Sequence, residues 1–391
     1  MKPLDDDLFE PLAEALGIDG YTADVPSKRS PSSGGGSKQQ QDLRRVSHQD
    51  IAREANVSRV TVSLVLAGKD QASEETRKRV LEVAQRLRYR PNLLVHGMQT
   101  GRSHTVGIIV PASMHFHAQV ARGIHDELVG KDYVPIQLWA NPKVNASLAP
   151  PGGDAAKDPK STELEQIHRL VDRRVDGIIV WPQDVSVPDV HFREIWQRHI
   201  PLVTVDRETT THADHVGTDE ELGGELVAEH LLKLGHRRVA HVTFPKPSGS
   251  VLRRGGAFIK TMQKAGVTVE MVNGRTEELE APLKQLLMRK DRPTAVFAAI
   301  DPMAMKVYSV AAALGLKIPQ DVSVVGYADF PFIADLVPPL TTVRQDPYEM
   351  GRKAAEILLD RIFDRMPNQG PLRLHLEPEL IVRASTTSAA M

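Results

Sequence analysis

The sequence predicts a small all-helical unit followed by a longer α/β region folded as two lobes. Three observations lead to this fold class. Residues 46–89 carry apolar side chains at helical spacing in three short segments. From Thr105 onward, short apolar runs alternate with helical segments, which is typical of a parallel sheet with right-handed crossovers. The chain has 391 residues, too many for one ordinary hydrophobic core.

Each helix of the small unit follows a serine. Ser47, Ser58 and Ser73 are good N-cap residues, and Asp50 places an acid where first-turn amides attract one. We expect the first helix to end near Asn56. Such a small core suits a DNA-binding unit better than a catalytic domain. The apolar residues that would form it are Ile51, Ala55, Val62, Val65, Leu66, Val80, Val83, Ala84 and Leu87.

Apolar runs mark the strands of the α/β region. They are "TVGIIV", "VPIQLW", "VDGIIVW", "IPLVTVD", "RVAHVTF", "TAVFAAI" and "DVSVVGY". Spread over the rest of the chain, so many strands indicate two lobes rather than one sheet. The segment "NPKVNASLAPPGGDAAKDPKST", residues 141–162, interrupts this pattern and predicts a mobile surface loop. Ahead of the helical unit, "SKRSPSSGGGSKQQQ" predicts a flexible tether.

Charge is distributed unevenly along the chain. The net charge is −1, yet residues 44–103 contain 12 Lys or Arg against 6 Asp or Glu. A small basic module joined to a mildly acidic remainder indicates nucleic-acid binding by the module. The alternative is a charged face that only meets water.

Composition excludes several kinds of site. The chain has no cysteine, so it has neither disulfides nor thiolate metal ligands. No apolar run approaches the roughly 20 residues of a membrane helix, and the acidic N-terminal segment lacks the apolar core of a signal peptide. We therefore expect a cytoplasmic protein without a membrane partner. The motifs G-x-S-x-G, G-x-x-x-x-G-K-[ST] and H-E-x-x-H are missing, so we expect no enzyme, no metal and no cofactor.

The stretch "DIAREANVSRVTVSLVLAG" reads as two helices broken at "ANVS", which predicts a helix-turn-helix. The second helix of this motif can lie in the major groove of double-stranded DNA. Arg59 can form a bidentate pair with a guanine edge, and Val60 and Thr61 can contact a thymine methyl group. The serines suit phosphates, although each can equally be a simple cap. The expected DNA-binding residues are Ser47, Ser58, Arg59, Val60, Thr61 and Ser63.

The sequence resembles the LacI/GalR family of transcription regulators from about Arg45 to about Ala384. The signatures, in order, are "DIAREANVSRVTVS", "SEETRKRVLEVAQRLRYRPN", "VGTDEELGGELVAEHLLKLGHRRVAHV", "DVSVVGYADF" and "PPLTTVRQDPYEMGRKAAEILL". The resemblance implies a helix-turn-helix headpiece joined to two Rossmann-like lobes similar to a periplasmic binding protein, with an effector cleft between them. It also implies a homodimer on a pseudo-palindromic operator.

This reading divides the chain into four parts. They are an N-terminal extension and tether (1–44), the headpiece (45–90), a hinge (91–103) and the effector domain (104–391). In the family the hinge inserts an apolar wedge into the minor groove, which implies DNA contacts by Asn92 and Met98. An ordinary linker with a buried methionine is the alternative. Leu64 and Ala67 replace residues with which relatives read DNA, so Arg59 would carry more of the recognition.

The resemblance also implies a set of effector-binding residues. Asp301 follows a strand end, where ligands gather in such sheets, although a helix N-cap is an alternative role. Arg254, with Arg253 as fallback, would grip the ligand from the opposite side. Arg275 stands where several sugar-binding relatives have a tryptophan, which favours an anionic ligand unless Arg275 points to water. The full set is His115, Phe116, Trp181, Arg254, Arg275, Asp301 and Asp329.

The sequence therefore predicts a DNA-binding transcription regulator, most simply a repressor, controlled by a sugar or sugar derivative. Two alternatives remain. One is a regulator with a vestigial cleft, which would show no response to any ligand. The other is a solute-binding protein, against which the basic helix-turn-helix argues. The effector, the operator and the direction of the control cannot be read from the sequence.

Overall fold

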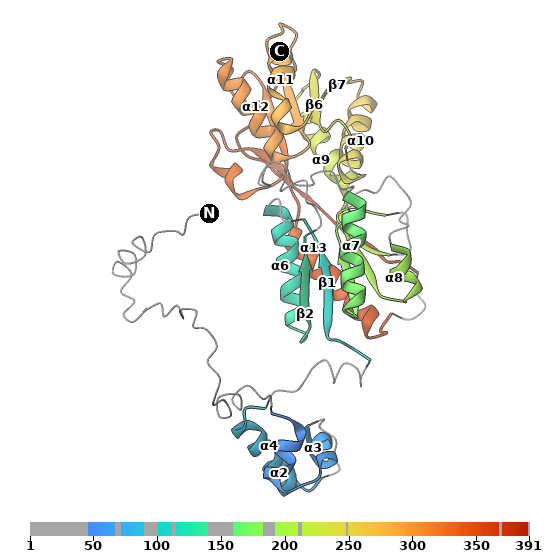
Figure 1. The fold of residues 1–391 in the computed structure, drawn as a ribbon. Helices are drawn as coiled ribbons and strands as arrows, with labels where there is room; N and C mark the ends of the chain where they lie inside the picture. Colours follow the sequence, from blue (N-terminus) through green and yellow to red (C-terminus); the bar gives the residue numbers. More distant parts are fainter. Residues whose placement is uncertain are drawn as a thin grey trace, which may run out of the picture. The chain divides into compact units, whose positions relative to one another are not determined.

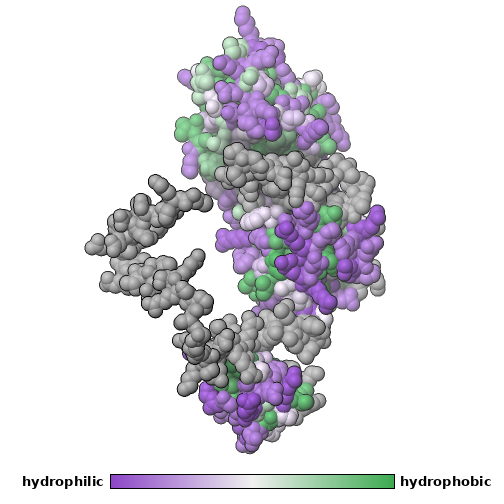
Figure 2. All heavy atoms as spheres, in the orientation of Figure 1, coloured by the Kyte–Doolittle hydropathy of each residue, from purple (hydrophilic) through white to green (hydrophobic). Residues whose placement is uncertain are grey.

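The computed structural model describes residues 46–66, 72–89, 101–111, 115–139, 159–182, 192–209, 213–247, 249–366 and 370–389. The chain forms two compact units, Met1–Pro91 and Asn92–Met391, which are described separately here. Within the described residues no helix is long and apolar enough to cross a membrane. Hydrophilic side chains are spread over all described parts of the face drawn in Figure 2.

The N-terminal unit contains the three predicted helices, α2 (His48–Ala55), α3 (Arg59–Leu66) and α4 (Glu74–Arg86). The predicted caps are confirmed. The Asp50 amide donates to Ser47 Oγ, and the Ser47 amide donates to Asp50 Oδ2 at 2.9 Å. Asn56 ends α2 in the left-handed conformation, with φ 50°. The buried core comprises Ile51, Ala52, Ala55, Val62, Val65, Val80, Val83 and Ala84.

The first lobe of the larger unit is built on a parallel sheet of order β11-β5-β4-β3-β1-β2. Ile108 and its neighbours on one face pack under α6 (His115–Val129) and α13 (Pro347–Ile362), while Ile109 faces α7 (Pro159–Asp172) and α8 (Arg193–Gln197). The strands are β1 (Thr105–Ile109), β2 (Val134–Leu138), β3 (Gly177–Val180), β4 (Leu202–Val205), β5 (Asp214–Thr218) and β11 (Arg373–Leu376).

The second lobe is built on a sheet of order β12-β10-β9-β8-β6-β7, in which only β12 runs antiparallel to its neighbour. Its strands are β6 (Val239–Thr243), β7 (Val269–Asn273), β8 (Ala295–Ala298), β9 (Ser323–Ala328), β10 (Thr341–Arg344) and β12 (Glu379–Ile381). Its helices are α9 (Glu220–Lys233), α10 (Gly249–Lys264), η4 (Thr276–Glu278), α11 (Glu280–Leu287), α12 (Asp301–Ala313) and η5 (Pro331–Asp335).

The chain passes between the lobes three times, after β5, after β10 and between β11 and β12. As a result α13, which follows the second lobe's β10 in sequence, packs against β3, β4 and α6 of the first lobe (Figure 1). The helices α6 and α13 cross at glycines. A Cβ atom added to Gly351 would lie 2.0 Å from the Val120 carbonyl oxygen, so their backbones are in direct contact.

The two-lobed parallel architecture confirms the fold class predicted from the sequence. The seven apolar runs correspond to β1, β2, β3, β4, β6, β8 and β9. The remaining strands are short or mixed in polarity, as in "DHVGT" and "TTVR", and carry no strong apolar signal. The surface loop predicted at 141–162 extends too far at its C-terminal end, because α7 begins at Pro159. Residues 141–158 lie outside the described residues.

Candidate DNA-binding face and effector cleft

The start of α3 presents the side chains expected to read DNA. Ser58 Oγ caps the helix by accepting a hydrogen bond from the Thr61 amide at 3.0 Å. Arg59 is exposed and forms no hydrogen bond or ion pair with the described residues, while Val60 is 67% exposed. Val62 and Val65 on the opposite side are buried and hold the helix in place. The helix therefore presents a cation and an apolar side chain together.

The other residues predicted to contact DNA form local hydrogen bonds, are half-buried, or lie outside the described residues. Ser47 Oγ donates to Asp50 Oδ2 at 2.6 Å, and Thr61 shares a hydrogen bond with Ser58, so both hydroxyls already serve local caps. Ser63 is half-buried. Phosphate contacts by these residues stay predictions. Asn92 and Met98 lie outside the described residues.

Aromatic side chains gather at the carboxyl end of the first lobe's sheet. Phe116 and His117 lie in the first turn of α6, and Trp181 follows β3 directly. The Trp181 ring meets the Phe116 ring edge-on at 5.8 Å and the His117 ring at 4.4 Å. All three are buried, whereas His115 is exposed with its ring 6.3 Å from that of Phe330 in the second lobe. The structure thus brings the predicted residues His115, Phe116 and Trp181 to one end of the sheet.

Arg254 lies opposite, in a buried ion pair that the sequence did not reveal. Its Nε and Nη2 donate to the two carboxylate oxygens of Glu220 at 2.7 and 2.8 Å, and Nη1 donates to the Ala299 carbonyl. The guanidinium lies 3.7 Å from the centre of the Tyr327 ring, and the Tyr327 hydroxyl donates to Glu220. Arg254 is only 4% exposed. Its charge is therefore neutralised within the protein.

Asp206 is a second residue that the sequence reasoning missed. It follows β4 at the same sheet end as Trp181, with φ 60°, and is 7% exposed. Burial and the nearby Glu220 carboxylate raise the pKa of Asp206 to about 7, against the opposing effect of Arg207 and Arg254. Its carboxyl group forms no hydrogen bond with the described residues. The signal was present, because "IPLVTVD" places an acid at a strand end, as in the case of Asp301.

Gln345 connects this group of residues to two of the passages between the lobes. Its Nε2 donates to Thr218 Oγ1 at 2.9 Å and to Glu220 Oε1 at 3.2 Å. Thr218 ends β5 and Gln345 follows β10, so both residues stand where the chain leaves one lobe for the other. The candidate effector site, called the effector cleft from here on, consists of Phe116, His117, Trp181, Asp206, Glu220, Arg254, Tyr327 and Gln345. Gln345 ties this group to two of the passages.

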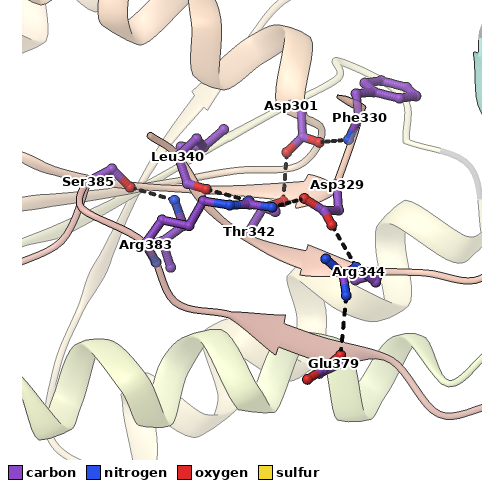
Figure 3. A network of polar contacts seen from close by, with 10 residues as sticks. Asp301, Asp329, Phe330, Leu340, Thr342, Arg344, Glu379, Arg383 and Ser385 are labelled. Carbon is purple, nitrogen blue, oxygen red and sulfur yellow. Dashed lines mark hydrogen bonds and ion pairs between the residues drawn. The ribbon is translucent and has the colours of Figure 1, made fainter. Parts of the chain in front are cut away.

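The ligand contact expected of Asp301 stays a prediction, and the structure gives its carboxylate other partners. Asp301 is 0% exposed, and its oxygens accept hydrogen bonds from the Thr342 hydroxyl at 2.7 Å and the Phe330 amide at 2.9 Å (Figure 3). The N-cap alternative is wrong, because Ile300 is the N-cap of α12. Burial raises the pKa of Asp301 to about 6, although both hydrogen bonds oppose this. Asp301 is a positioning residue that fixes Phe330 and β10.

Asp329 and Arg275 also form ion pairs with neighbouring side chains. Asp329 accepts hydrogen bonds from Arg344 Nε at 2.6 Å and Arg383 Nη2 at 2.7 Å (Figure 3). Arg275 is exposed, and its Nη2 lies 3.0 Å from Glu278 Oε1. The hydrogen bond and charge of Glu278 raise the pKa of Arg275 above its usual range. This geometry favours the reading in which Arg275 points to water, and it removes the argument for an anionic ligand.

Comparison with known proteins agrees with both parts of the structure. Residues 48–92 match the family model "Bacterial regulatory proteins, lacI family", and residues 228–386 match "Periplasmic binding protein-like domain". The chain is 31% identical over 343 residues to the HTH-type transcriptional repressor PurR of Vibrio vulnificus, covering 85% of this chain and 96% of that protein.

Solved structures show the same fold. The lac repressor dimer bound to operator and the anti-inducer ONPF aligns with a TM-score of 0.74 at 23% identity, covering 88% of this chain and all of that one. The complex of the transcriptional regulator CelR with cellobiose aligns with a TM-score of 0.61 at 27% identity, covering 87% and 100%. The chain therefore belongs to the lacI family of bacterial regulatory proteins and is a DNA-binding transcriptional regulator.

Proposed function

We propose that the protein is a repressor that binds a pseudo-palindromic operator as a homodimer and is controlled by a neutral, hydroxyl-rich effector, a sugar or sugar derivative. The two relatives named as repressors support the first part. The exposed pair Arg59 and Val60 on α3 supplies a base-reading surface, because a guanidinium pairs with guanine and an apolar group meets a thymine methyl.

The observation that carries the effector assignment is the carboxyl group of Asp206. It is 7% exposed, accepts no hydrogen bond from the described residues, and follows the strand next to the one that Trp181 follows. A carboxyl group that accepts no hydrogen bond from its neighbours can accept one from a ligand hydroxyl. A sugar offers hydroxyl donors to the acid and apolar ring faces to aromatic side chains such as Phe116 and Trp181, and the solved structure of the transcriptional regulator CelR is a complex with cellobiose.

A neutral effector fits the charges better than an anionic one. Arg254 is already neutralised by Glu220, and Arg275 by Glu278. An anion bound at Arg254 would be repelled by the carboxylate of Glu220, which has only 1% of its side chain exposed. A hydroxyl group can instead accept from the guanidinium and donate to Asp206 without adding charge.

Control would follow from a population shift between lobe arrangements. A ligand held from both lobes favours the arrangement in which its contacts are complete, and it can shift the equilibrium only by its difference in affinity for the two states. Gln345 and Thr218 lie at the passages between the lobes, where such a change must be accommodated. The effector state would thereby alter operator affinity.

A thermal-shift screen of the full chain tests this assignment. The probes are cellobiose, ribose, glucose 6-phosphate and adenine. A probe at about 100 times its dissociation constant adds roughly 2.7 kcal/mol of stability to the domain that binds it. We expect a neutral sugar to stabilise the wild type and Arg275→Ala, the matched control outside the cleft, but not Asp206→Asn.

Other outcomes point to the alternatives. Stabilisation by glucose 6-phosphate that disappears in Arg275→Ala would restore the anionic reading. A protein that binds a duplex selected from a random pool, but responds to no probe, would match the regulator with a vestigial cleft. Any probe that stabilises the protein is then added to the complex with the selected duplex, where a change in DNA affinity is expected.

A further inference from the structure

The segment that leads from the hinge into the effector domain is held at one end of the first lobe. The Ser103 amide and hydroxyl donate to Asp176 Oδ1 at 2.7 and 3.0 Å, and the His104 amide donates to Asp176 Oδ2 at 2.9 Å. Asp176 directly precedes β3, and its own amide donates to the Thr105 carbonyl. One half-buried carboxylate therefore fixes two successive residues at the entrance of β1.

The backbone at His104 shows why this carboxylate is needed. His104 has φ 52°, a left-handed conformation that residues with a side chain adopt at a cost. The bonds to Asp176 offset that cost, because hydrogen bonds to a charged acceptor are among the stronger ones. The Val134 amide donates to the His104 carbonyl at 2.9 Å, which fixes the other side of the same residue. The Asp176 carboxylate thus fixes the direction in which the chain enters β1 from the hinge.

The C-terminal end of α13 holds the same segment from another side. Arg102 Nη2 donates to the Ile362 carbonyl at 3.1 Å, which places a cation at the negative end of the helix. The Arg102 guanidinium also lies 4.9 Å from the centre of the Phe363 ring, and Arg365 lies 4.8 Å from the same ring. Tyr133 meets Phe363 edge-on at 6.0 Å. Arg102, Ser103, His104, Asp176 and Phe363 are named here the hinge anchor.

The N-terminal end of α13 lies at the effector cleft. Gln345, two residues before the helix, donates to Glu220, the buried partner of Arg254. A helix of 16 residues spans about 24 Å, so one rigid element joins the cleft to the hinge anchor. Its contact with α6 at Gly123 and Gly351 is backbone against backbone, which leaves little room for the helix to shift without α6.

We propose that the hinge anchor positions the chain for operator binding and that α13 transmits the state of the effector cleft to it. The first half rests on the DNA-binding function of the family, and the second half also rests on the proposed effector cleft. Asp176, Arg102 and Phe363 act as positioning residues, because each is argued to act through the segment that it holds.

The anchor is tested with the full chain and a duplex selected from a random pool by the wild type. Asp176→Asn replaces one of the two oxygens that accept the three hydrogen bonds from Ser103 and His104, and Phe363→Leu keeps an apolar side chain but removes the ring next to the Arg102 guanidinium. We expect each variant to bind the selected duplex about tenfold more weakly, while binding to a random duplex at low salt stays within about twofold. Asp172→Asn, an exposed position at the end of α7, is the matched control and should bind like the wild type.

The two readouts separate positioning from a structural role. A structural defect lowers the thermal unfolding temperature and weakens both duplexes together, which would overturn the anchor. Full binding of the selected duplex by both Asp176→Asn and Phe363→Leu would also overturn it. Arg59→Ala gives the reference for lost base reading; if it too binds like the wild type, the fault lies with the proposed DNA-reading face.

Transmission along α13 is tested by a double-mutant cycle between Gln345→Leu and Phe363→Leu, read as affinity for the selected duplex. The two side chains lie beyond opposite ends of the helix, a distance at which independent effects add. We expect the double variant to differ by at least threefold from the product of the single effects. Simple additivity would refute transmission while leaving the anchor in place, and it requires no knowledge of the effector.

Discussion

Replacing Asp206 by asparagine should change how the stability of the effector domain depends on pH. The pKa of Asp206 is raised to about 7, mainly by burial, from an ordinary value of 3.8. Between these two values the folded protein keeps this proton and the unfolded chain loses it. The folded state therefore binds more protons, and the contribution of Asp206 to stability falls as pH rises from about 4 through 7.

The size of this effect follows from the separation of the two values. At about 1.4 kcal/mol per pKa unit, a shift from 3.8 to about 7 corresponds to roughly 4 kcal/mol. Asparagine resembles the protonated acid, so Asp206→Asn should match the wild type near pH 4 and exceed it by up to that amount at pH 8. Burial raises the pKa of Asp301 to about 6, so Asp301 also makes the unfolding free energy fall as pH rises. Asp301 is present in both proteins, so its effect cancels in the difference between them.

The assay is urea unfolding of both variants between pH 5 and pH 8. The three tryptophans, Trp139, Trp181 and Trp196, all belong to the larger unit, so fluorescence reports on that unit alone. A difference in unfolding free energy that stays within about 0.5 kcal/mol across this range would refute the reasoning. If a sugar donates hydrogen bonds to Asp206, it favours the carboxylate, and its affinity should rise with pH below 7.

Three further predictions concern other parts of the chain. Arg59→Ala should weaken binding to a selected duplex by about 1–3 kcal/mol, whereas Arg79→Ala, an exposed arginine on α4, should cost much less in the same gel-shift titration. Gly351→Ala should destabilise the larger unit by about 1–3 kcal/mol in urea, because the added Cβ meets the Val120 carbonyl oxygen at 2.0 Å; an equally stable variant would show that the two helices can separate. Burial, with the Arg207 charge, lowers the pKa of His117 to about 4, so its stabilising effect is lost as pH falls from about 6.5 toward 4; His117→Gln should flatten the acid side of the pH–stability curve, and an unchanged curve would contradict this.

The headpiece could be predicted almost to the residue because its signals are local. A serine cap, an acid three residues later and a short apolar face all lie within one turn or two of the helix that they define. Ser47 with Asp50, and Ser73 as an N-cap, behave in the structure as the sequence indicates. The buried strands were found for the same reason, since an uninterrupted apolar run is visible without knowing its neighbours.

The effector cleft could be predicted only in part because its chemistry depends on long-range partners. Arg254 was identified through the family resemblance, but Glu220, which neutralises it, lies 34 residues earlier. Asp301 matched a motif, yet Thr342 and Phe330, from other elements, occupy both of its oxygens. Charge at one position could be read from the sequence; whether that charge meets a ligand or a neighbour could not.

The three passages between the lobes have a consequence for synthesis. The first lobe needs α13 and β11, which are encoded after nearly all of the second lobe. A nascent chain that has emerged as far as β9 therefore holds a complete headpiece but exposes the face of the first sheet that α13 will cover. The DNA-binding unit can therefore fold long before the effector domain does. Neither lobe can complete its sheet until the segment from β10 (Thr341–Arg344) to β12 (Glu379–Ile381) has been synthesised.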